Sequence, residues 1–341
     1  MFERRGLPKT ETTPIIYLSG YGLNKSGTTV REQEIEWIKR TKCKYRCYSF
    51  AFACPGAFYY SRPVKESYDA SLQQGVRIMM DSGAFSFHGF LKNMTGKVSK
   101  KKKRQWNEEE VTKLREETIE KYVSWCKEHS KEWDFYCNFD YRPHAPLVWK
   151  VQQRLEKLGM RITPVFHGDQ GIDWLENYFK DGHKLVAVGT TAMQGRGTYR
   201  KKRIFYDMVF DKAEKYGAKM HGLAVTALGL MFQYPWASVD SASWVKVAAI
   251  GRIMYMDEMR GVIGQLHIST TSAKKGISYN QMVPTTQKEI RRQVEKNGWD
   301  FQELRENARE RGAYNAFLFN NKVHELKETI ERTATRWETL I

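Results

Sequence analysis

Four short runs of the chain end in acidic or imidazole residues directly after a stretch that is typical of a β-strand. These polar ends are Asp81, Asp140, His167 and Asp240. In a parallel α/β barrel the catalytic groups lie at the carboxyl ends of the strands, so these side chains would face one mouth. Two carboxylates in one mouth can act as nucleophile and as general acid or base. The pattern therefore indicates an enzyme.

The chemistry that suits Asp81 and Asp240 is cleavage of a glycosidic bond, because one carboxylate can attack a sugar C1′ while the other group handles the proton. Asp140 could read a guanine-like edge, since one carboxylate accepts two neighbouring N–H donors. Phe85 could stack on a planar base. Each residue also has a structural interpretation, because strand-end aspartates often cap helices or form turns and an isolated phenylalanine is often a core residue.

Two histidines leave other functions open. His167 and His221 could join Asp240 as metal ligands, which would make the chain a metal-dependent hydrolase. Against this, the first predicted strand has no His-x-His pair, and no acidic or imidazole ligand follows Leu18. A nucleic-acid-binding barrel without catalysis is a third possibility. A mere binder, however, gains nothing from acids that face phosphates.

The elements that must position these residues follow from hydrophobic period and turn signals. Strands are predicted at residues 14–18, 45–52, 76–81, 135–140, 162–167, 185–189, 219–225 and 237–240. Helical spacing separates them, most clearly after Asn107, which is typical of a helix N-cap. Eight strands that alternate with helices predict a parallel (β/α)8 TIM barrel.

After Asp240 the pattern becomes helical. Helices are predicted over residues 244–256, from a capping box of Thr286 and Glu289, and over 323–340. We therefore expect a catalytic barrel at residues 1–258 and a helical C-terminal extension at 259–341.

The charge balance predicts a polyanionic partner. The 341 residues include 56 Lys and Arg against 39 Asp and Glu, a formal charge of +17, and nucleic acid is the leading candidate. Two basic tracts follow the third and sixth predicted strands, where they could hold a phosphate backbone beside the acidic mouth. Their residues are Lys100, Lys101, Lys102, Lys103, Arg104, Arg196, Arg200, Lys201, Lys202 and Arg203. A further tract spans residues 39–46.

Neither a membrane nor a disulfide framework is expected. The N-terminus has no apolar signal region and no uncharged run approaches the length of a spanning helix, which predicts a cytoplasmic protein. Five cysteines without a secretory signal predict reduced thiols. Zinc at Cys43, Cys47 and Cys54 is disfavoured, because no histidine lies nearby and a fourth ligand is missing.

Five runs, in this order and at these spacings, resemble the barrel motifs of tRNA-guanine transglycosylases. They resemble more closely the phage and bacterial branch, the DpdA-type DNA-guanine transglycosylases, which insert 7-deazaguanines into DNA. The resemblance spans residues 75–245. The runs are Asp81-Ser-Gly-Ala-Phe-Ser, Val165-Phe-His-Gly, Leu185-Val-Ala-Val-Gly189, His221-Gly-Leu and Ser238-Val-Asp240.

This resemblance implies a role for each residue of the mouth. Asp240 would displace guanine and carry a covalent glycosyl intermediate, and Asp81 would be the acid and base for the leaving and incoming bases. Asp140 would read the Watson–Crick edge, with Phe85 as a stacking wall and His221 over the opposite face. The resemblance also implies a pocket without cofactor or catalytic metal, lined by Ser82, Gly83, His167, Gly168 and Gly189.

The chain departs from the tRNA enzymes in ways that bear on the substrate. Ala84 and Ser86 replace a glycine and a glutamine, and Thr190 stands where those enzymes carry a glutamate. Their structural zinc cluster cannot form, because no cysteine follows Cys137. Since that cluster is associated with tRNA binding, we expect DNA with a flipped-out nucleotide as substrate, and tRNA as the alternative. A free 7-deazaguanine would be the second substrate, in the host cytoplasm if the protein is phage-encoded.

Overall fold

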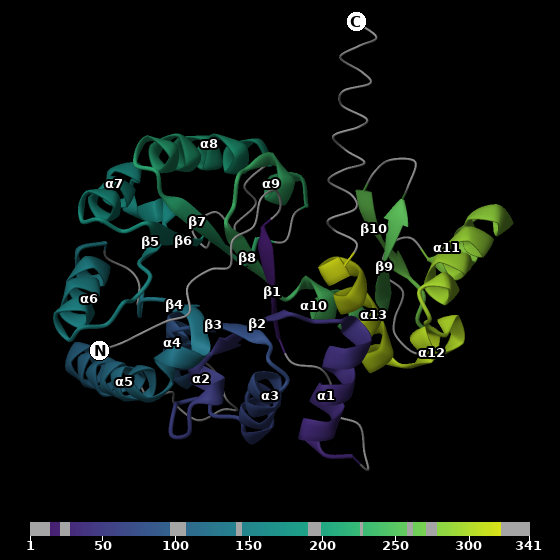
Figure 1. The fold of residues 1–341 in the computed structure, drawn as a ribbon, viewed down its shortest axis with the longest axis horizontal. Coiled ribbons are helices and arrows are strands. Elements are labelled where there is room, and N and C mark those ends of the chain that lie inside the picture. Colours follow the sequence, from purple (N-terminus) through teal and green to yellow (C-terminus); the bar gives the residue numbers. More distant parts are fainter. Residues whose placement is uncertain are drawn as a thin grey trace, which may run out of the picture.

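Eight parallel strands alternate with helices and curl into a barrel, so the predicted fold class is confirmed (Figure 1). The computed structural model describes residues 14–20, 28–95, 107–140, 145–189, 199–225, 228–257, 262–270 and 278–321. The barrel strands are β1 (Ile15–Ser19), β2 (Tyr45–Ser49), β3 (Arg77–Asp81), β4 (Trp133–Tyr136), β5 (Val165–His167), β6 (Leu185–Gly189), β7 (Lys219–Leu223) and β8 (Ser238–Ser241).

The strands follow one another around the barrel in chain order. They pair in parallel from β1 to β4 and from β5 to β8, and β8 pairs with β1. A parallel bridge of Cys137 with Thr163 links the segment after β4 to the segment before β5, and the Asn138 N–H donates to the Thr163 carbonyl at 2.8 Å. This bridge joins the two ends of the sheet, so all eight strand ends face one mouth.

Helices surround this sheet on the outside (Figure 1). They are α1 (Val30–Thr41), α2 (Phe50–Ala53), α3 (Arg62–Gln73), α4 (Ala84–Thr95), α5 (Glu108–His129), α6 (Ala145–Lys157), α7 (Ile172–Lys180), α8 (Tyr199–Lys215), α9 (Leu228–Gln233) and α10 (Ser243–Ala249). The Asn107 N-cap of α5 is confirmed, since its side chain accepts from the Glu110 N–H at 2.8 Å. In the described part of the chain, no helix is both long and apolar enough to cross a bilayer.

The second strand is shorter than predicted. It ends at Ser49, and residues 50–52, which were expected to continue it, lie in α2. The reason is tertiary: by turning at the mouth, the chain buries Phe50 edge-on against Tyr122 of α5, with ring centroids 5.1 Å apart.

Alternate strand residues fill the barrel interior, as the two-residue period of a strand requires. One buried cluster contains Tyr17, Met79, Phe135, Val165 and Ala187. Towards the amino ends of the strands, the Tyr17 hydroxyl donates to Asp134 at 2.6 Å and the Arg77 guanidinium lies 2.7 Å from the same carboxylate. The interior is therefore a packed core, with neutralised charge at its amino end.

The segment after the eighth strand is not purely helical. The helix predicted over residues 244–256 is wrong, because α10 ends at Ala249 and β9 (Arg252–Asp257) follows. β9 pairs antiparallel with β10 (Val262–His267), where Ile253 lies opposite Leu266 and both side chains are fully buried. This cross-strand pair stabilises a hairpin that residue spacing along one segment could not reveal.

Three helices follow the hairpin: α11 (Pro284–Lys296), α12 (Phe301–Glu306) and α13 (Ala308–Asn321). The predicted capping box of Thr286 and Glu289 is wrong, since both residues lie inside α11 and Val283 is its N-cap without a side-chain cap. Pro284 begins the helix instead, because its fixed φ and missing N–H suit the first position. The helix predicted over residues 323–340 lies outside the described residues.

The C-terminal elements pack on the side of the barrel that carries α1 and α10 (Figure 1). Asn315 of α13 donates to the Trp244 carbonyl at 3.2 Å and accepts from the Met254 N–H at 2.7 Å. One hydrophobic cluster extends from the barrel into α13. The hairpin and this cluster both cross the predicted boundary between residues 258 and 259.

Candidate active site

The carboxyl ends of four barrel strands carry the predicted acids and imidazole. Asp81 ends β3, Asp140 follows β4, His167 ends β5 and Asp240 lies in β8. Burial raises the pKa of Asp81 to about 7, the negative charges of Asp140 and Asp240 add to the rise, and the Ser49 hydroxyl opposes it. Within the described residues, no lysine or arginine forms an ion pair with any of these three acids.

Asp81 is held by a tight turn at the start of α4. The Gly83 N–H donates to Asp81 Oδ2 at 3.0 Å. Gly83 has a φ of +76°, and a Cβ there would lie 2.6 Å from the Ala51 Cβ, so only glycine fits. Ser82 is fully buried, with its hydroxyl 3.4 Å from Asp140 Oδ1. Phe85 is 72% exposed, so it lies outside the core and is open to a planar ligand.

His167 and Asp140 come from neighbouring strand ends and contact each other at the mouth. His167 Nε2 contacts Asp140 Oδ2. The ring fits because its neighbour on β6 is Gly189, where a Cβ would lie 2.3 Å from His167 Nδ1. Gly168 packs against the Phe205 ring, which a Cβ would approach to 3.0 Å. Both glycines therefore make room for aromatic rings.

Asp240 accepts hydrogen bonds from a side chain and from a backbone group of neighbouring segments. The Ser19 hydroxyl donates to Oδ2 at 2.7 Å, and the Ala224 N–H donates to Oδ1 at 2.8 Å. Ala224 has a φ of 53°, a left-handed conformation that is unfavourable for a residue with a Cβ. Since an ionised carboxylate only accepts hydrogen bonds, the two donors fix its orientation.

His221 lies inside the barrel beneath Asp240. Its side chain has no exposed surface, and its ring packs edge-on against Tyr17 and Phe135, with centroids 6.2 and 5.0 Å away. Nδ1 lies 2.8 Å from the Ser238 hydroxyl, and Nε2 lies 3.6 Å from Asp240 Oδ1. His221 therefore lies against Asp240 inside the barrel and not at the surface of the mouth. This differs from the expectation that its ring would lie over one face of the bound base.

Several groups at the site were not predicted as functional residues. Ser19 directly follows the predicted strand 14–18, so the rule that selected the acids could have found it. Ser49 ends β2 but lies inside the strand predicted at 45–52, so that prediction concealed it. Cys47 lies near Asp240 and Asp81; burial, and then these charges, raise the pKa of its thiol well above its ordinary value. The Ala224 donor is a backbone N–H and leaves no signal in residue type.

The basic residues divide into two groups. Lys100 to Arg104 and Arg196 lie outside the described residues, as does Thr190. Four others, Arg200, Lys201, Lys202 and Arg203, belong to the first turns of α8, which follows β6 at the mouth. The tract at residues 39–46 serves the fold, because Arg46 is fully buried 3.3 Å from Glu34 and Arg40 pairs with Glu310 at 2.7 Å.

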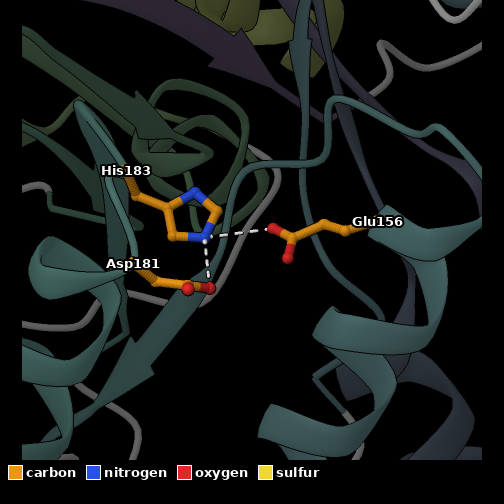
Figure 2. Close-up of side chains that lie close together, drawn as sticks. All are labelled: Glu156, Asp181 and His183. Atoms are coloured by element: carbon orange, nitrogen blue, oxygen red, sulfur yellow. Dashed lines mark ion pairs between the residues drawn. The ribbon is translucent and has the colours of Figure 1, made fainter.

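The proposed metal ligands His167, His221 and Asp240 do not converge. Among the described residues, a group of histidine and acids whose ligand atoms lie within 4.8 Å of one another is Glu156, Asp181 and His183. His183 Nε2 lies 3.0 Å from Glu156 Oε1 and 3.9 Å from Asp181 Oδ2 (Figure 2). Burial would raise the pKa of Glu156, but hydrogen bonds from His183 and Gln152 outweigh it and lower the pKa.

This second cluster lies at the opposite end of the barrel from the mouth, because its residues come from the end of α6 and from the loop before β6. Both carboxylates face the same imidazole nitrogen (Figure 2). An ion pair of His183 with Glu156 therefore accounts for the arrangement, and it joins α6 to the start of β6.

Comparison with known proteins finds little that is similar. No protein-family model matches the chain, and no curated protein matches it. Among solved structures, the HpcH/HpaI aldolase from Desulfitobacterium hafniense DCB-2 aligns with a TM-score of 0.33 and 12% identity, over 70% of this chain and 90% of that chain. Likeness at this level assigns no activity, so the geometry of the mouth is the basis for a function.

Proposed function

We propose that this chain is a transglycosylase that exchanges guanine in DNA for a free 7-deazaguanine base. Asp240 is the nucleophile and Asp81 the general acid and base. The two environments that separate these carboxylates carry the proposal. Both carboxylates accept hydrogen bonds, but burial, and then the charges of Asp140 and Asp240, bring the pKa of Asp81 to about 7. Two acids in one site with divergent environments suit different roles.

The reaction proceeds in two balanced displacements. In the first, an Asp240 oxygen bonds to C1′ as the C1′–N9 bond breaks; the electron pair passes to guanine, which receives a proton from Asp81. In the second, N9 of the incoming base bonds to C1′ and gives its proton to Asp81. The bond between Asp240 and C1′ breaks, and its electron pair restores the carboxylate. A group with a pKa near 7 can hold or release that proton at neutral pH.

Base recognition falls to the groups around Asp140. Its carboxylate is 14% exposed and already faces two polar groups, His167 and Ser82. The N–H donors of guanine would compete for these oxygens, and Phe85 on α4 is exposed enough to stack on the ring. The free 7-deazaguanine presents the same donor edge, so one pocket serves both bases.

DNA as the partner is supported by charge and by position. The net charge is +17, and the first turns of α8 carry four basic residues beside the mouth. A helix N-terminus favours anions and disfavours cations, so a basic N-terminal turn is stabilised when a phosphate lies against it. The phosphate contacts would hold the strand while one nucleotide enters the mouth.

The test is incubation of the purified protein with guanine-containing DNA and radiolabelled guanine, with tRNA in parallel. Guanine exchange requires no knowledge of the natural 7-substituent. Asp240→Ala is the inactive variant. Asp173→Ala is the matched control, because its carboxylate is 94% exposed and lies 3.9 Å from Lys212. We expect label in DNA for the wild type and the control, and none for Asp240→Ala.

The other outcomes separate the alternatives. If label enters tRNA alone, the proposed reaction stands but its substrate is tRNA and not DNA. If Asp240→Ala is fully active, Asp240 is not the nucleophile. Absence of label from both nucleic acids, together with stoichiometric metal in the purified protein, would favour a metal-dependent hydrolase instead.

A further inference from the structure

A buried imidazole beneath Asp240 has a ring nitrogen that no described residue satisfies. His221 is fully buried, and its Nε2 has no hydrogen-bond partner among the described residues. Asp240 Oδ1 lies 3.6 Å from this nitrogen, beyond ordinary hydrogen-bond length. Buried polar atoms without partners are rare in native proteins, and those that persist call for an explanation.

We propose that His221 is a positioning residue that orients the Asp240 carboxylate and stabilises its charge from inside the barrel. This inference rests on the role of Asp240 in the proposed function. It replaces the expected contact of His221 with the base, because the side chain has no exposed surface. His221 moves no proton in either displacement.

Electrostatics selects which ring nitrogen carries the proton. Nδ1 faces the Ser238 hydroxyl at 2.8 Å, and that hydroxyl can donate or accept. Nε2 faces a carboxylate oxygen, so a bare nitrogen there would place two lone pairs against each other. The favoured arrangement has Ser238 donating to Nδ1 and the Nε2–H directed at Asp240. Ser238 thus fixes both the orientation and the tautomer of the ring.

The packing around the ring keeps this geometry. Tyr17 and Phe135 contact the imidazole edge-on, so it is enclosed by aromatic rings from β1 and β4. The other groups that face Asp240 are the Ser19 hydroxyl, the Ala224 N–H and, through space, Cys47 and Asp81.

The contribution is largest where Asp240 regains its charge. In the covalent intermediate Asp240 is a neutral ester, and the second displacement returns the electron pair to the carboxylate. A preorganised donor aimed at that oxygen stabilises the charge as it develops. His221 therefore acts on the rate of the second displacement and not on DNA binding.

The first arm of the test needs no catalytic activity. In protein labelled with ¹⁵N-histidine, the ring nitrogen shifts report which nitrogen carries the proton, and loss of the signal in His221→Gln assigns it among the 8 histidines. We expect a protonated Nε2 and a bare Nδ1, with a change of the Nε2 signal in Asp240→Asn. A proton on Nδ1, or a signal indifferent to Asp240→Asn, would overturn the inference.

The second arm measures guanine exchange. His221→Leu removes the donor, and we expect kcat to fall about 10- to 100-fold with little change in KM for DNA. His221→Gln places an amide N–H near Nε2 and should recover most of kcat, which a purely structural role would not produce. His183→Gln is the matched control at the other end of the barrel, and its kcat should be unchanged. If His221→Leu does not fold, Ser238→Ala replaces it, because loss of the hydroxyl frees the ring that it orients and should also lower kcat.

The two arms separate failure of this inference from failure of the proposed function. If the wild type exchanges no base but the histidine signals respond to Asp240→Asn, the function is wrong and the contact stands. If the wild type exchanges bases and His221→Leu retains its kcat, the function stands and the positioning role is wrong.

Discussion

Strand β3 begins and ends in residues that belong to opposite electrostatic environments. At its start, the Arg77 guanidinium lies 2.7 Å from the fully buried Asp134, which also accepts from the Tyr17 hydroxyl. At its end, Asp81 faces the charges of Asp140 and Asp240. The amino end of the barrel thus pairs its acids with cations, and the mouth places acids together without lysine or arginine partners among the described residues.

The difference shows which end maintains the fold and which end is available for chemistry. Paired charges at the amino end satisfy one another, and the His183 ring lies 3.0 Å from Glu156 at the same end. At the mouth, burial and then the charges of the neighbouring carboxylates raise the pKa of Asp81, so its ionised form costs stability. Strained or destabilised groups of this kind are retained at functional sites. The two ends should therefore respond in opposite ways to mutation.

The largest expected effect is on catalysis at the mouth. Asp240→Asn keeps the shape of the side chain but removes the nucleophilic charge, so exchange should fall by about 10³-fold or more. Its thermal stability should stay close to that of the wild type, because the amide fills the same space and the lost charge has no lysine or arginine partner among the described residues. Exchange assays with calorimetry on the same preparation check both expectations. If the variant instead loses thermal stability but keeps its exchange rate, Asp240 has a structural role like that of Asp134.

The second effect belongs to the amino end. Arg77→Met leaves Asp134 buried without its cation, which should lower the free energy of unfolding by about 3 kcal/mol. Exchange per folded molecule should be unchanged. Urea unfolding measures the loss. Arg291→Met breaks an exposed pair with Glu295 and is the control, with an expected change below about 1 kcal/mol. Equal losses in both variants would contradict the comparison.

The third effect tests the room that β6 leaves for an imidazole. Gly189→Ala introduces a Cβ that would lie 2.3 Å from His167 Nδ1, so the ring must leave Asp140. Overpacking should cost about 1–3 kcal/mol, and exchange should fall with it. Gly89→Ala in α4 is the matched control, since its Cβ meets nothing within 4 Å. Wild-type exchange by Gly189→Ala would show that the contact of His167 with Asp140 is dispensable.

The smallest effect is the pH dependence of stability that Asp81 creates. Its pKa is about 7 in the folded state against an ordinary 3.8, so the folded state holds this proton more tightly than the unfolded chain. The stabilisation is complete below pH 4 and is lost as the pH rises through 7. Asp81→Asn does not titrate, and a shift of this size corresponds to about 4 kcal/mol at pH 8 at most. Since Asp81 is only partly buried, solvent screening should leave the variant about 1–2 kcal/mol more stable than the wild type at that pH.

Unfolding measured for both proteins across this pH range would check the difference. It should shrink to near zero at pH 4. A difference that grows towards low pH would mean that Asp81 is stabilised as a carboxylate, and it would remove the basis for its role as a general acid.

The sequence pattern predicted an element correctly where the residues of that one segment determine it. The presence and order of the eight barrel strands, the Asn107 cap and the positions of Asp81 and Asp240 near strand ends are confirmed, because the two-residue period of a strand is visible in consecutive residues. The predicted termini were less accurate, since the strand predicted at 135–140 lies at Trp133–Tyr136. The β9 strand was missed, since its stability comes from Leu266 and the other residues of a partner strand. The start of α11 was also missed, because the capping pattern of Thr286 competed with a proline signal.

The sequence by itself determined that acids, imidazoles and glycines stand at the ends of parallel strands. The tertiary structure alone decided how they are used. It placed Ser19 against Asp240 across 221 residues, directed a backbone N–H from Ala224 at the same carboxylate, and buried His221 beneath it. These contacts depend on closure of the barrel, which brings distant strand ends to a few ångströms. The residue type determines which chemistry a side chain can perform, and closure of the barrel determines which groups surround it.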